Sequence, residues 1–190
     1  MADIINNLSP EGMLRLIDGQ IEKIDTVGTD EVIRLRRDLQ GNGDDASQWF
    51  DYGIVLNQAA MHRDMLVAQR EQLLHPEAEE VEVDFSGSVP IYEEALKAYR
   101  HVLEMEPEYY GVHTQMGVVL GNLHRLEEAE ACYLEALKED EEDFSAAYYL
   151  GLTYRDMGRE DLAQKYLKLA HELNPDDESM TSAQGEVVER

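Results

Sequence analysis

Apolar residues recur every three to four positions along most of the chain, which is the spacing of amphipathic helices. The first helix is expected to begin at Ser9-Pro10-Glu11, because serine caps a first turn and proline fits the first helical position. A second, shorter helix is expected from Thr29 to Gln40, before Gly41-Asn42-Gly43. The apolar stripe of the first helix consists of Met13, Leu16, Ile17, Ile21 and Ile24. We expect this pair to form an extension that packs on the helices that follow.

Two later segments share one pattern of small and large residues, shifted by thirty-four positions. They read GVHTQMGVVLGNLHRLEEAEACYLEALKEDE and SAAYYLGLTYRDMGREDLAQKYLKLAHELNP. Gly117 coincides with Gly151, and Ala129 coincides with Ala163. A fixed period of this length is typical of stacked helix pairs. Small residues are needed where the two helices of a pair cross closely, and large residues fill the space around them.

These segments resemble the tetratricopeptide repeat (TPR), whose pattern is W-x2-L-G-x2-Y, then A-x3-F, then P. The last copy reads Leu150-Gly151-x2-Tyr154, Ala163-x3-Leu167 and Pro175. The middle copy departs from the pattern, with Glu141 in place of the proline. The resemblance implies an all-α fold, an α-solenoid of antiparallel helix pairs in a right-handed superhelix, with an N-terminal helical extension.

A third copy is split by an insertion. Trp49-x2-Tyr52-Gly53 matches a first helix, and the stretch from Ile91 to Pro107 matches a second. However, Gly53 and Ala95 are 42 positions apart, whereas the matching residues of the other copies are 12 apart. About thirty residues near 62–89 are therefore inserted. The alternative is a chance match, with an array of only two and a half repeats.

The insertion is expected to prolong the first helix. Helix-forming residues continue to Leu74, and His75-Pro76 should stop the helix there. The acidic stretch EAEEVEVDFSGSVP then forms a loop. Val81, Val83 and Phe85 would share one side of an extended segment. Two alternatives stay open: a disordered acidic loop, or a segment that covers the protein's own groove.

The predicted organisation has three parts. The extension spans 1–45, the TPR domain 46–177 and a polar tail 178–190, with repeats at 46–109, 110–143 and 144–177. We expect the tail to be frayed, since it has few apolar residues to bury.

In the TPR family, the first helices of successive repeats line a concave groove that holds a peptide or a partner helix. The resemblance implies such a groove here, at the matching positions Phe50, Ile54, Asn57, Thr114, Val118, Asn122, Tyr148, Leu152 and Arg155. One TPR subclass grips a C-terminal carboxylate with Lys, Arg and Asn. This chain has Thr114, Val118, Ser145 and Tyr149 at those places, so we exclude that function. Asn122 and Arg155 remain candidate hydrogen-bond donors, and the alternative for Phe50 and Ile54 is packing within the array.

The second helix of the last repeat carries an apolar stripe where the family usually has polar residues. It consists of Leu162, Tyr166, Leu169 and Leu173. Either the tail or a neighbouring helix covers this stripe, or it is an interface for a partner or for a second copy in a homodimer.

Charge narrows the choice of partner. The chain of 190 residues has 41 acidic and 16 basic residues, a formal net charge of −25. Such a field repels nucleic acid and anionic membranes. It fits a solvated surface in a salt-rich cytoplasm, or a protein partner whose basic residues flank apolar anchors. We expect a cytoplasmic protein without a membrane span or secretory signal, and the single Cys132 forms no internal disulfide.

The sequence contains no pattern typical of catalysis. Its six histidines lack metal-ligand spacing, and it has neither H-E-x-x-H nor a glycine-rich phosphate loop. We therefore expect no enzyme, cofactor or metal. The predicted function is a non-catalytic adaptor, scaffold or assembly factor that binds a peptide or helix in an apolar groove. The alternative is a small acidic TPR export or assembly chaperone with one dedicated client, similar to those of bacterial secretion systems.

Overall fold

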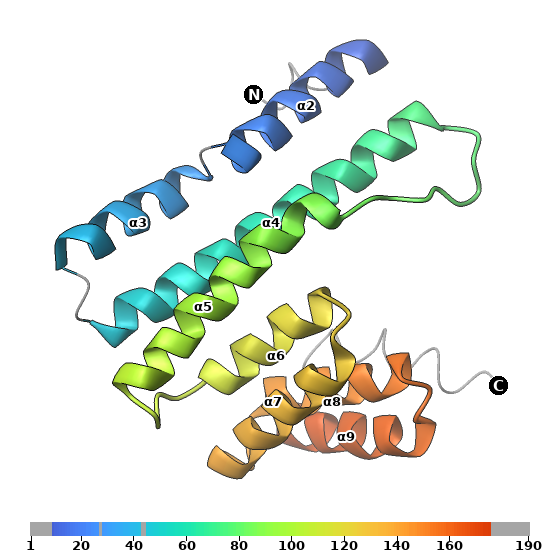
Figure 1. Ribbon diagram of the computed structural model, residues 1–190. Helices are drawn as coiled ribbons and strands as arrows, with labels where there is room; N and C mark the ends of the chain where they lie inside the picture. The colour runs from blue at the N-terminus through green and yellow to red at the C-terminus, as the bar shows by residue number, and fades with distance from the viewer. Residues whose placement is uncertain (1–8, 27, 43–44, 176–190) are drawn as a thin grey trace. The chain divides into compact units, whose positions relative to one another are not determined.

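The computed structural model describes residues 9–26, 28–42 and 45–175, and these residues form helices and loops without a strand. The elements are α2 (Pro10–Thr26), α3 (Asp30–Asn42), α4 (Ala46–Leu74), the short 3-10 helix η1 (Ser86–Ser88), α5 (Val89–Met105), α6 (Val112–Asn122), α7 (Leu126–Glu139), α8 (Phe144–Asp156) and α9 (Glu160–Leu173) (Figure 1). The predicted all-α solenoid of helix pairs is confirmed. Within the described residues, every helix is too short or too polar to cross a membrane. The predicted tail lies outside the described residues.

The chain divides into two compact units. Unit 1 runs from Met1 to Met105, and unit 2 runs from Glu106 to Arg190. Unit 1 therefore combines the extension helices α2 and α3 with the helix pair α4 and α5. Unit 2 contains α6, α7, α8 and α9.

Helices α2, α4 and α8 begin at a side-chain cap, and α4 ends at a proline stop. The Ser9 hydroxyl accepts a backbone N–H bond of 3.2 Å at the start of α2. The Asp45 carboxylate accepts one of 2.9 Å at the start of α4. Helix α4 then continues to Leu74, as predicted, with His75 as its C-cap. The helix ends there because Pro76 disfavours helical geometry at the residue before it.

The three helix pairs share one close contact between a glycine of the first helix and a large side chain of the second. The contacts join Gly53 to Tyr99, Gly117 to Tyr133 and Gly151 to Leu167. A Cβ atom on the glycine would lie 2.5 Å from the ring in the first two pairs and 2.7 Å from the leucine Cγ in the third. Only glycine permits such an approach. The contact between α4 and α5 is thus the one that the split first repeat predicts, and the assignment of these helices to a repeat stays a prediction.

In unit 1 the extension packs on the part of α4 that the insertion adds. Ile17 and Ile24 of α2 form a buried cluster with Leu66 of α4. Ile21, Leu73 and Ile91 pack against this cluster. The extension and the insertion, both outside the repeat pattern, thus bury each other's apolar side chains.

A network of hydrogen bonds joins the same elements. Arg63 of α4 is 8% exposed and donates to the Asp25 carboxylate of α2, with Nε at 2.5 Å and Nη2 at 3.1 Å. Its Nη1 lies 3.4 Å from the Ser88 hydroxyl of η1. Ser88 and Tyr92 both donate to the Asp64 carboxylate. The network therefore connects α2, α4, η1 and α5 at one place.

The acidic loop that follows α4 returns along the same helix. Asp84 lines a hollow together with Arg63 and Arg70. Phe50 and Ile54 precede Arg63 by nine or more residues, which is about 13 Å or more along a helix. Within unit 1 the loop thus lies beyond Phe50 and Ile54, and the idea that it covers them is not supported there.

Candidate functional site

The predicted groove residues of unit 2 lie on α6 and α8, two first helices that contact each other. Val118 of α6 and Leu152 of α8 are half-buried, so part of each apolar side chain stays open. Asn122 is exposed at the end of α6, and the half-buried Arg155 lies in the last turn of α8. The two helices thus offer apolar contact with an amide and a cation towards their C-terminal ends.

Tyr148 extends this surface with an ordered aromatic group. Its ring stacks on Phe144, with centroids 5.9 Å apart, and meets Tyr149 edge-on at 5.4 Å. Tyr149 in turn stacks on the buried Tyr133 at 6.2 Å. A ring held by such neighbours loses little conformational freedom when a partner packs on it.

Thr114 does not fit the predicted role. Its side chain is buried, and its hydroxyl donates to Asp143 Oδ2 at 2.6 Å. Asp143 is the N-cap of α8 and accepts from the Ala146 N–H at 2.9 Å. Thr114 therefore links α6 to the start of α8, and we leave it out of the proposed binding surface.

The remaining predicted groove residues belong to α4 in unit 1. Phe50 is half-buried, and its ring packs on Tyr99 at a centroid distance of 5.8 Å. Ile54 is half-buried, whereas Asn57 is only 7% exposed. Asn57 thus offers little surface to a partner. A groove that continues from these residues to those of unit 2 stays a prediction.

The four residues of the apolar stripe of α9 lie in different environments. Tyr166 and Leu169 line a hollow of about 710 Å³ between α7 and α9, which we call the α7–α9 hollow. Its other lining residues are Ala131, Leu134, Glu135, Leu137, Lys138, Glu141 and Lys165. Leu162 is 37% exposed. Leu173 packs against the buried Ala147 and Ala170, so it serves the core.

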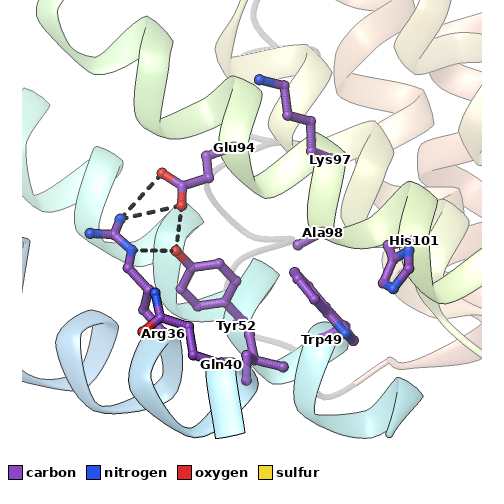
Figure 2. A pocket seen from close by; sticks show the side chains of 9 residues that line it. Arg36, Gln40, Trp49, Tyr52, Glu94, Lys97, Ala98 and His101 are labelled. Carbon is purple, nitrogen blue, oxygen red and sulfur yellow. Dashed lines mark hydrogen bonds and ion pairs between the residues drawn. The ribbon is translucent and has the colours of Figure 1, made fainter. Parts of the chain in front are cut away.

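Unit 1 contains a hollow that the sequence did not predict (Figure 2). It has a volume of about 520 Å³, and we call it the α3–α5 hollow. Its lining residues are Arg36, Leu39 and Gln40 of α3, Trp49 and Tyr52 of α4, and Glu94, Lys97, Ala98 and His101 of α5. Leu39 and Ala98 are buried, and the Trp49 and His101 rings meet edge-on with centroids 4.7 Å apart. The hollow thus has an apolar, partly aromatic lining.

A hydrogen-bonded cluster closes one side of the α3–α5 hollow (Figure 2). The Tyr52 hydroxyl donates to Glu94 and accepts from Arg36 Nε at 3.0 Å. Arg36 Nη2 donates to both Glu94 oxygens, at 3.2 and 3.3 Å. Burial, together with the hydrogen bond to Glu94, raises the pKa of Tyr52 to about 12. Its hydroxyl therefore stays protonated at neutral pH and holds α3 against α4 and α5.

Metal-ligating side chains are dispersed. In the described part of the chain, no three His, Cys, Asp or Glu side chains are placed to hold a metal ion. His113 stands where the repeat pattern has tryptophan, and its Nδ1 lies 2.8 Å from Glu139 Oε1. It thus connects α6 to α7.

The tetratricopeptide repeat family model matches residues 110–143 and 145–177. Both ranges lie in unit 2 and contain the two helix pairs with the shared glycine contact. Unit 2 therefore contains two tetratricopeptide repeats. In unit 1, Gly53 and Ala95 are 42 positions apart, so the period of thirty-four is interrupted there.

The chain has relatives of low sequence identity. It is 24% identical over 99 residues, or 52% of this chain, to anaphase-promoting complex subunit 3 of Schizosaccharomyces pombe, and it spans 15% of that protein's length. The solved structure of MamA AMB-1 has a TM-score of 0.54 at 21% identity, with 97% of this chain and 81% of that chain covered. The thermophilic TPR protein TTC0263 of Thermus thermophilus has a TM-score of 0.51 at 21% identity, with 94% and 98% covered. These structures share the fold.

Sequence reasoning missed the α3–α5 hollow because the hollow depends on where α3 packs. The TPR pattern assigns Trp49 and Tyr52 to packing positions, and it does not cover the extension that supplies Arg36. One feature of the sequence could have pointed to this hollow and to its counterpart in unit 2. Lys97 and Lys165 are two of only five lysines, and they stand 68 positions apart, which is two periods of thirty-four.

Proposed function

We propose that this protein is a non-catalytic interaction scaffold that binds a peptide or helix of a partner protein. We place the binding surface on the first helices of unit 2, with Val118, Asn122, Tyr148, Leu152 and Arg155 as contacts. The observation that carries the proposal is the half-open apolar side chains of Val118 and Leu152 on two helices in contact. Stacked helix pairs suit this task because they present such side chains on a continuous, rigid face.

The chemistry of the surface indicates the partner. Val118, Tyr148 and Leu152 would receive apolar anchors of a helix or an extended chain. The net charge of −25 favours a partner with basic residues beside those anchors, since opposite charge speeds the encounter. Phe50 and Ile54, at the matching positions of α4, are the contacts that we propose for unit 1.

The test begins with twelve-residue peptides selected for binding from a displayed random library. Leu152→Ser should lower the affinity of a selected peptide at least tenfold, because it removes an apolar anchor contact worth about 1.4 kcal/mol or more. Affinity is measured by isothermal titration calorimetry. Leu162→Ser, at an exposed position of α9, is the matched control and should change little.

Circular dichroism melting shows whether both variants remain folded. Equal affinities of the wild type and a folded Leu152→Ser variant for every selected peptide would overturn the proposed surface.

A further inference from the structure

We propose that the α3–α5 hollow is a second binding site, for a segment of a partner protein that brings one large apolar side chain and a nearby carboxylate. The site lies in unit 1 and uses none of the residues of the surface proposed above. The two proposals therefore stand or fall separately.

The lining of the hollow suits an apolar anchor. Trp49 contacts the rings of both Tyr52 and His101 edge-on, at centroid distances of 6.2 and 4.7 Å. Leu39 and Ala98 complete an apolar floor that neighbouring helices hold in place. The volume of about 520 Å³ is in the range of pockets that enclose a ligand or a few side chains. One aromatic or long aliphatic side chain would fit with part of its backbone.

The charges around the hollow favour an acidic segment. Both oxygens of Glu94 are occupied by Arg36, and one of them also accepts from Tyr52. Within the described residues, Lys97 forms no ion pair and Arg36 Nη1 no hydrogen bond. With His101 neutral, the lining residues carry two cations and one carboxylate, a net charge of +1 in a chain of −25. A carboxylate at the edge would meet the open donors of Lys97 and Arg36.

The positive charge of the hollow can attract an acidic segment although the chain as a whole is negative. At physiological salt, charges more than about 8 Å apart are largely screened. A bound carboxylate would therefore sense Lys97 and Arg36 more strongly than the distant acidic surface. Local complementarity chooses the segment, whereas net charge mainly affects how fast it arrives.

The hollow has a counterpart in unit 2. Lys97, Ala98 and His101 of α5 correspond, 68 positions later, to Lys165, Tyr166 and Leu169 of the α7–α9 hollow. Arg36, Leu39 and Gln40 of α3 have the same spacing as Leu134, Leu137 and Lys138 of α7. Helix α3 packs on α4 as α7 packs on α8. Helix α3 thus packs where the second helix of a preceding repeat would lie. A lysine lines the hollow in each unit, Lys97 in unit 1 and Lys165 in unit 2.

The experiment uses an array of twelve-residue peptides, each with one central phenylalanine or leucine and no tryptophan. The flanks are Asp and Glu, Asn and Gln, or Lys and Arg. The best binders are titrated into the full chain while the emission of Trp49, the only tryptophan, is followed. Peptides with acidic flanks should bind best and shift this emission.

Two charge reversals locate the binding site. Lys97→Glu should weaken acidic peptides at least tenfold. Lys168→Glu, an exposed lysine of α9 outside the hollow, should change their affinity less than twofold. Circular dichroism verifies that both variants fold. Leu152→Ser should leave this binding intact, which separates the outcome from that of the first proposal.

Three results would overturn the assignment. Acidic peptides could fail to shift the Trp49 emission, basic flanks could bind better, or a folded Lys97→Glu variant could keep its affinity. Light scattering tests whether a second copy of the chain fills the hollow instead. If the wild type is a dimer and Lys97→Glu dissociates it, the ligand of the hollow is that second copy and not a partner segment.

Discussion

Gly117 lies where α6 crosses α7, and the Tyr133 ring occupies the space that a side chain would need. Alanine usually stabilises a helix interior by about 1 kcal/mol relative to glycine, so glycine here must be retained for its size. Gly121, one turn later, is different. A Cβ atom there would lie 3.9 Å from the Tyr133 hydroxyl, an ordinary contact.

Gly117→Ala should therefore destabilise unit 2. We expect a loss of about 1 to 3 kcal/mol from forced displacement of the Tyr133 ring, the usual cost of overpacking a core. Urea unfolding followed by circular dichroism measures it. Gly121→Ala is the matched control and should be neutral or slightly stabilising. A Gly117→Ala variant as stable as the control would show that the crossing tolerates a side chain.

Within unit 1, helix α2 is held against α4 by a buried apolar cluster and by two ion pairs. The two pairs differ in burial. The Arg63 side chain is 10% exposed where it meets Asp25, whereas the Arg70 side chain is 37% exposed where it meets Asp18. Loss of a partner costs more at a buried cation, because the charge left behind cannot be hydrated freely.

Asp25→Ala should thus loosen α2 more than Asp18→Ala does. We expect Asp25→Ala to cost about 1 to 3 kcal/mol, a value between those of exposed and buried pairs, and Asp18→Ala less than about 1 kcal/mol. Denaturant unfolding gives the free energies, and hydrogen exchange should be faster in α2 while unit 2 stays unchanged. Equal effects of the two substitutions would contradict the role given to burial.

Helix α3 shows how an element outside the repeat can act as part of it. Its residues do not follow the TPR pattern, yet it packs on α4 as α7 packs on α8. In a solenoid, each helix pair buries one face against the next pair. The first helix pair therefore needs another helix to pack on its remaining face. Helix α3 is that helix and creates the α3–α5 hollow.

Across the whole molecule, buried tyrosine hydroxyls couple stability to alkaline pH. Burial is the largest cause that raises the pKa of Tyr52, Tyr92, Tyr99, Tyr133 and Tyr154. A hydroxyl with a raised pKa adds its full stability below the unfolded pKa of about 10. That stability is lost as the pH rises through the folded pKa, which for Tyr52 is about 12.

The protein should accordingly unfold as the pH rises from about 10 towards 12, because unfolding releases the protons of these hydroxyls. Far-UV circular dichroism follows the helices, and tyrosinate absorbance follows ionisation. Tyr52→Phe should be less stable by about 1 kcal/mol at neutral pH, where it lacks the hydrogen bonds to Glu94 and Arg36, but should lose less stability over this window. Tyr149→Phe, an exposed ring, is the control. Full ionisation of all ten tyrosines with the helices intact would refute the coupling.

Local and repeated features could be predicted from the sequence alone. The end of α4 at His75 follows from Pro76, and the pairing of α4 with α5 follows from the match of Gly53 and Tyr99 to the later repeats. Periodicity, caps and small residues act between neighbours or recur at a fixed spacing, so a single chain displays them. The helices and their pairing were therefore determined by the sequence.

Tertiary structure decided which side chains are open and which distant ones meet. Thr114 has a groove position in the pattern, but its hydroxyl is used by Asp143, 29 residues away. Arg63 meets Asp25 across 38 residues, and Arg36 meets Glu94 across 58. No period links Arg63 with Asp25 or Arg36 with Glu94, because these contacts depend on how the extension packs against the insertion and the first helix pair. The buried network and the α3–α5 hollow arise only from that packing.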